Sequence, residues 1–137
     1  MVQTFTTTGS HPDAPAMVTL DLLRRPLRDL LMGLSLMPVT PSGQPDYGQA
    51  EPDLLVRLAE SAELVLNILH GGFSAIGLLY ACTAVQIANG DIGTTPATAI
   101  GRLQVELGEA LAYVQALAFE CRRYTADYVG GTGDEAA

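Results

Sequence analysis

Residues 96–129 read PATAIGRLQVELGEALAYVQALAFECRRYTADYV. Their apolar positions recur at alternating steps of three and four, the heptad seam of a helix that packs lengthwise against other helices. The seam runs through Ile100, Leu103, Leu107, Ala110, Val114, Leu117, Cys121, Tyr124 and Tyr128. At 1.5 Å per residue such a helix is roughly 50 Å long, so we expect the rest of the chain to pack along it. The seam therefore predicts an all-α fold, a small helical bundle with a long C-terminal helix.

Two shorter helices are expected before this one. The first spans Asp53–His70, with Pro52 in its first turn and Gly71-Gly72 ending it. The second spans Ser74–Asn89 and stops near Gly90. It carries no charge, and its small residues, which let a neighbouring backbone come close, predict that it is the most buried helix. The small residues are Ser74, Gly77, Ala81, Ala84 and Ala88. Together with the long helix, these two predict three antiparallel helices.

The amino-terminal third of the chain predicts an arm and a strap. Thr19–Met37 carries a helical pattern in which Pro26 either kinks the helix or begins it afresh. A proline-rich linker then joins this helix to the core. The predicted organisation is a flexible N-terminal arm (1–18), a kinked helix with a Pro-rich linker (19–51), a three-helix core (52–130) and a disordered tail (131–137).

Composition narrows the classes of function. The chain has 137 residues, of which 48% are hydrophobic and only 16% charged, against about 25% charged in an ordinary domain. A small protein this apolar is expected to bury surface against a second copy or a partner. The formal charge is −8, which argues against direct nucleic-acid binding, because affinity for phosphate backbones needs clustered Lys and Arg. All seven basic residues are arginine, which favours a bacterial source with GC-rich coding.

No constellation for chemistry is visible in the sequence. Cys82 and Cys121 stand apart in apolar helical segments, without the spacing of a metal site, and are interpreted as free thiols in a reducing compartment. Nucleophile elbows, phosphate loops and zinc-binding helix motifs are missing from the sequence. The amino terminus lacks the pattern of a secretory signal. We therefore expect a cytoplasmic protein that is not an enzyme and holds no cofactor or metal.

One apolar run raises the question of a membrane. Leu64 to Gly90 contains no Asp, Glu, Lys or Arg. The run is expected to break at His70-Gly71-Gly72, so that each helical piece is shorter than the roughly 20 apolar residues that a bilayer crossing needs. The sequence therefore favours a helical hairpin in a soluble bundle, with no membrane contact.

The carboxy-terminal half of the long helix is the predicted interface. It outruns its two shorter partners, so we expect its seam to meet a second copy in a homodimer that buries Val114, Leu117, Cys121 and Tyr124. Arg122, Arg123, Tyr124 and Tyr128 also have the composition of a binding hot spot. Packing of the two tyrosines inside the seam is the alternative for those residues.

Two function classes follow from these patterns. The first is a non-enzymatic protein–protein interaction module, a small regulator, adaptor or inhibitor that binds a protein partner and acts as a homodimer. The alternative is a small-molecule or lipid binder with an apolar cavity around Leu79, Cys82 and Leu111.

Overall fold

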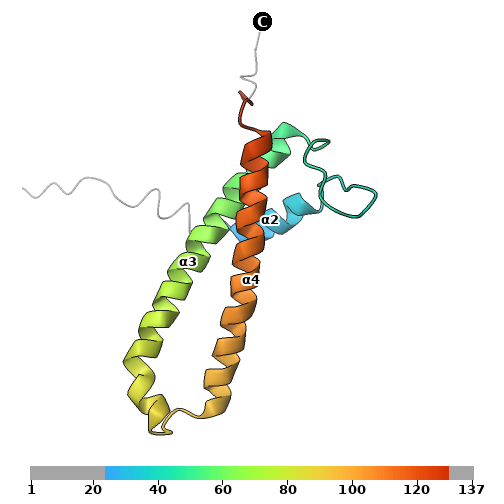
Figure 1. The fold of residues 1–137 in the computed structure, drawn as a ribbon. Helices are drawn as coiled ribbons and strands as arrows, with labels where there is room; N and C mark the ends of the chain where they lie inside the picture. Colours follow the sequence, from blue (N-terminus) through green and yellow to red (C-terminus); the bar gives the residue numbers. More distant parts are fainter. Residues whose placement is uncertain (1–23, 130–137) are drawn as a thin grey trace, which may run out of the picture.

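The computed structural model describes residues 24–129, and within that range the fold is all-α, as predicted (Figure 1). It contains a short helix α2 (Pro26–Leu34) and two long helices, α3 (Pro52–Ala88) and α4 (Thr94–Tyr124). The long helices pack side by side as an antiparallel hairpin, and α2 packs against α3. The predicted arm (1–18) and tail (131–137) lie outside the described residues.

Helix α3 runs unbroken through Gly71-Gly72, so the predicted break there is wrong. Each glycine inside a helix costs up to about 1 kcal/mol relative to alanine. Ending the helix would cost more, because its half-buried positions continue across the pair at heptad spacing. These positions are Leu66, Leu69, Phe73, Ile76, Tyr80, Thr83 and Ile87. Between residues 52 and 129 the structure therefore has two long helices where three were predicted, and α3, at 37 residues, is longer than α4, at 31.

The turn between the long helices lies at the predicted place. Gly90 adopts a left-handed conformation with φ of +79°, which glycine reaches without the steric cost that other residues meet. The backbone N–H groups of Asp91 and Ile92 both donate to the carbonyl of Gln86, at 2.9 and 3.2 Å. These bonds give a free carbonyl at the end of α3 its hydrogen-bond donors and hold the turn that leads into α4.

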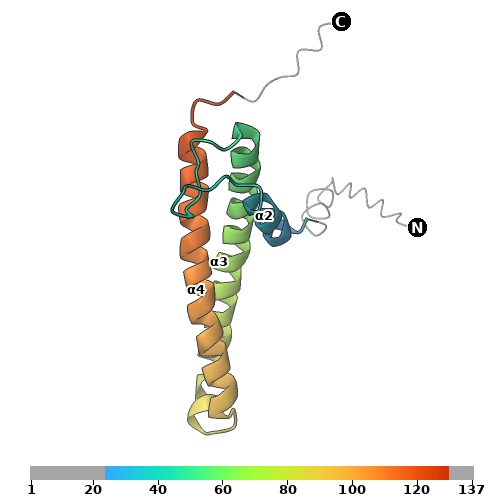
Figure 2. The same cartoon turned by 90° about the vertical axis from the view of Figure 1, so that its right-hand side faces the viewer.

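Helix α2 begins at Pro26, so the second of the two predicted alternatives is confirmed. A proline fits the first turn because its missing N–H has no partner there in any helix. Gly33 gives α2 its close approach to α3: a Cβ at this position would stand 2.7 Å from Cδ2 of Leu58. Figure 2 shows α2 against one side of the hairpin, followed by the loop that leads to α3. That loop holds one isolated bridge, between Val39 and Pro45.

The core occupies only one end of the hairpin. Buried residues of α3 fall between Leu54 and Val65, and those of α4 between Val114 and Cys121. Leu30 of α2 and Met37 complete the cluster. We call residues 52–65 and 114–124 the core half of the hairpin, and residues 66–113 the distal half. Within the described chain, no residue of the distal half is buried.

This placement reverses the expected overhang. The carboxy-terminal half of α4 was predicted to outrun its neighbours, yet it lies along the first four turns of α3 in the core half. The amino-terminal half of α4 and the second half of α3 project beyond α2 instead (Figure 1). The uncovered part of the seam is thus at the opposite end of the helix from the predicted one.

Candidate functional site

Three of the residues predicted to form the dimer interface are buried by other parts of the same chain. Val114 is 6% exposed, Leu117 2% and Cys121 0%. All three belong to the core cluster, together with Leu55 and Leu58 of α3. Burial raises the pKa of the Cys121 thiol to about 11, so it stays protonated and unreactive at neutral pH. The homodimer remains a prediction, but these three side chains are already occupied by intramolecular packing.

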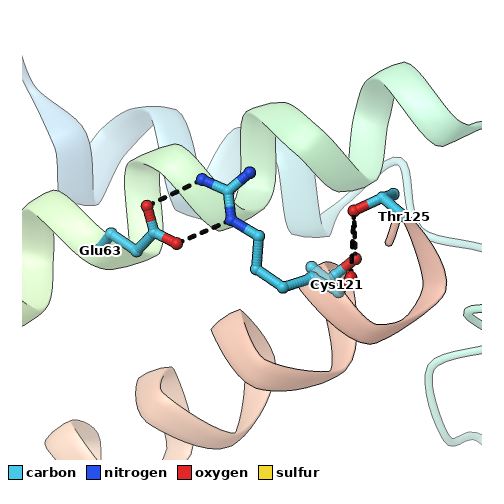
Figure 3. A network of polar contacts seen from close by, with 4 residues as sticks. Glu63, Cys121 and Thr125 are labelled. Carbon is cyan, nitrogen blue, oxygen red and sulfur yellow. Dashed lines mark hydrogen bonds and ion pairs between the residues drawn. The ribbon is translucent and has the colours of Figure 1, made fainter. Parts of the chain in front are cut away.

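Arg122 joins the two long helices (Figure 3). Its Nε donates to Oε1 of Glu63 at 2.8 Å, and its Nη2 donates to Oε2 at 2.9 Å, a bidentate pair. The hydrogen bonds from Arg122 lower the pKa of the Glu63 carboxyl below its usual value. Nearby, the Thr125 hydroxyl donates to the backbone carbonyl of Cys121 at 2.8 Å, a bond within the end of α4. Arg122 thus ties α4 to α3.

The remaining predicted hot-spot residues also make contacts within the chain. Tyr124 stacks on Tyr47 of the loop, with ring centroids 5.7 Å apart. The Arg123 guanidinium lies over the Tyr124 ring, 5.8 Å from its centroid. The Tyr128 hydroxyl donates to Oδ1 of Asp53 at 2.5 Å. These contacts fasten the end of α4 to the loop and to the start of α3.

The structure brings together a different apolar surface, on the distal half. On α3, Ile68 lies beside the amino-terminal end of α2, with which it lines a surface cleft of about 420 Å³. Leu79 follows three turns later on the same side of the helix. On α4, Leu107, Leu103 and Ile100 continue the stripe of buried Val114 toward the turn. We define the distal face as Ile68, Ile76, Leu79, Ile100, Leu103 and Leu107.

Most of the distal face is open to solvent although its composition is that of a core. Ile68 is 62% exposed, Leu79 64% and Leu103 52%, and Ile100 is exposed as well. Ile76 and Leu107 are half-buried at its inner edge. Both of its stripes continue surfaces that meet in the core cluster at the other end of the hairpin. Large apolar side chains that are contiguous and uncovered mark interaction sites more often than isolated ones do. This face is the candidate functional site.

A half-buried seam holds the two distal helices together behind this face. Phe73, Tyr80 and Thr83 of α3 are half-buried toward α4, where small or short residues such as Ala97, Gly101 and Gly108 are half-buried in turn. The Tyr80 hydroxyl donates to the carbonyl of Ala97 at 3.2 Å. The distal half is therefore a formed hairpin, and its outer faces are available for contact.

Exposure also changes how the middle of α3 is interpreted. The small residues Ser74, Gly77, Ala81, Ala84 and Ala88 are all exposed, so the prediction that they mark the most buried helix is wrong. Leu79 and Cys82 lie on the outer surface instead of around an interior cavity. A cleft of about 470 Å³ lies elsewhere, between α2 and α3, lined by Met32, Leu36 and Leu58 among others.

Because α3 is continuous, the length argument against a membrane no longer holds. Within residues 24–129, α3 is the one helix long and apolar enough to cross a bilayer, and little of its apolar window is buried. Helix α4 is not such a helix: Arg102, Glu106 and Glu109 are exposed along its distal half. A charged side chain costs about 3 kcal/mol at the centre of a membrane helix. These charges make α4 poorly suited to a bilayer interior, whereas α3 by itself has the length and composition that a crossing requires.

The distal face had a visible signal in the sequence. The signal is the uncharged run from Leu64 to Gly90, which one continuous helix carries, in contrast to the predicted division at Gly71-Gly72. Residues 24–129 contain no cluster of His, Cys, Asp or Glu able to hold a metal ion. Comparison of the chain with protein-family models, curated proteins and solved structures finds no match.

Proposed function

We propose that this chain is a non-enzymatic protein–protein interaction module that binds through the distal face. The observation that carries the proposal is the uncovered apolar surface of the distal half, on a hairpin whose other half has a packed core. The role fits a small regulator, adaptor or inhibitor. In such a protein the core half would hold the hairpin in shape, and the distal half would carry the binding surface. Binding surfaces placed on rigid helices lose less conformational entropy on association.

Three further observations support this proposal over a small-molecule or lipid binder. Leu79 and Cys82, which were to line a cavity, are surface residues. Ligand pockets for small molecules are concave and enclose most of their ligand, whereas Leu79 and Leu103 of the distal face are exposed on the surface of two antiparallel helices. The exposed charges on α4 oppose insertion among lipid chains.

Site-specific photo-crosslinking in lysate of the native host tests the proposal. A photoreactive benzoylphenylalanine in place of Leu79 is expected to give discrete adducts on the full-length chain. The same residue in place of Leu36 is the matched control, because Leu36 is equally exposed, at 68% against 64%, but lies beside α2 at the core half. Adducts from neither position, or equally from both, would contradict a specific surface on the distal half.

A further inference from the structure

Resting on that proposed function, we infer that the occupant of the distal face is the distal face of a second copy, packed in the opposite direction. The two distal halves would form a four-helix bundle, with each turn near residue 90 pointing toward the partner's α2. This is a different dimer from one built on Val114, Leu117 and Cys121, which are buried within the chain.

The first reason is chemical. The α3 side of the face lies in a stretch with no charged residue from Leu64 to Gly90, so it offers no electrostatic recognition to a charged partner. A matching surface must itself be apolar and uncharged over about 30 Å of helix. A second distal face meets that requirement, because it carries the same uncharged α3 surface and the isoleucine and leucine side chains that recur at heptad spacing on α4.

The second reason is area. About twenty residues of helix span roughly 30 Å, and two adjacent helices are about 20 Å wide, so the distal half presents about 600 Å² of surface. A standard stable interface takes roughly 800 Å² from each partner. Side chains raise the accessible area of a face above its flat projection, which brings the distal half close to the area that a standard dimer buries on each partner.

The third reason is α2, which also sets the direction. Helix α2 covers the hairpin on the side where Val65 and Ile68 lie, up to the beginning of the distal face. If the two turns pointed the same way, both α2 helices would meet, and each is about 10 Å thick, which would hold the distal faces apart. In the opposite arrangement, the partner's distal half occupies the layer that α2 leaves empty.

The mass of the full chain in solution tests the dimer. Wild type is expected at twice the 14.4 kDa chain mass at micromolar concentration. The double variant Leu79→Glu/Leu103→Glu is expected to be monomeric with an unchanged helical circular dichroism spectrum, because both positions are exposed in the single chain. Leu36→Glu, at similar exposure beside α2, is the control and should stay dimeric.

Cross-linking with a short bismaleimide tests the direction. In a Cys82→Ser background, a mixture of Ile68→Cys and Asp91→Cys chains should link, while each alone should not. Linking of Asp91→Cys alone would place the two turns together and overturn the arrangement.

Several results would overturn the second copy as occupant. They are a monomeric wild type, a dimer indifferent to the distal glutamates, or a monomer that co-floats with phosphatidylcholine vesicles. A monomeric wild type that still gives adducts from position 79 but not from position 36 would leave the proposed function standing with another protein as partner.

Discussion

The core half and the distal half of the hairpin are built from the same helices with the same heptad spacing, yet only one is covered. In the core half, α2 and the loop lie over the hairpin and bury Leu58 and Leu117 to 1–2% exposure. In the distal half, Leu79 and Leu103 stand at corresponding places along the stripes and are more than half exposed. Periodicity therefore marks which side of a helix is apolar, while the third element decides whether that side becomes core or surface.

Truncating one leucine in each half gives the largest contrast. Leu58→Ala should lower the free energy of unfolding by about 2–5 kcal/mol, because it leaves a cavity in a fully packed site. Leu79→Ala should change it by less than about 1 kcal/mol in the monomer, because the side chain is 64% exposed there. Urea unfolding of the monomeric chain measures both. Equal losses at the two sites would mean that the distal half is covered as well.

The two cysteines report the same contrast through chemistry. A pKa of about 11 leaves Cys121 about a hundredfold less thiolate at neutral pH than an ordinary thiol. Cys82, which is exposed, should react with iodoacetamide much faster than Cys121, which is both buried and protonated. Mass spectrometry of the alkylated chain measures both rates. Raising the urea concentration should increase the alkylation rate of Cys121 alone. Fast alkylation of Cys121 in the native protein would contradict a closed core.

The sequence predicted the parts of the fold that depend on local rules. Pro26 begins a helix because its fixed φ suits the first turn, and Gly90 ends one because glycine tolerates the left-handed φ that the turn requires. Gly71-Gly72 looked like an equally firm stop, but glycine ends a helix only where a left-handed residue is wanted, and the seam from Leu69 to Phe73 continues across the pair. Local preference was overridden by packing that becomes visible only in the tertiary structure.

The candidate site was harder to predict for a similar reason. The residues predicted to form an interface, such as Cys121 and Tyr124, have the composition of one, but α3 and Tyr47 already contact them. The sequence could not tell which end of the α4 seam is covered, because that depends on the length of α3 and on where α2 packs. Once α3 is a single helix, the end near the turn is the uncovered one.

Two glycine-to-alanine changes sharpen the comparison with opposite signs. Gly33→Ala should destabilise the fold by about 1–2 kcal/mol, because the added Cβ meets the buried Leu58 side chain at 2.7 Å. Gly71→Ala should stabilise it by about 0.5–1 kcal/mol, because its Cβ meets nothing within 4 Å and alanine favours the helix. Thermal unfolding of both variants beside wild type measures the difference. A loss of stability in Gly71→Ala would show that the pair is needed as a flexible joint.

The smallest expected effect is within the core half, where Arg122 pairs with Glu63. Because the folded pKa of Glu63 is lowered, the pair stabilises the fold above the unfolded pKa of the carboxyl and loses that effect as the pH falls through the folded value. Both side chains are nearly half exposed, so solvent screening limits the contribution to about 0.2–1 kcal/mol. Glu63→Gln should therefore slightly weaken the dependence of the free energy of unfolding on pH in acid. High salt should weaken the same dependence in wild type, because it screens the ion pair. Urea midpoints measured from neutral pH down to acid check it, with Glu109→Gln, on exposed α4, as the control. A strong pH effect at Glu63 would mean that this pair is shielded from water, as it would be if a partner covered the core half instead of the distal face.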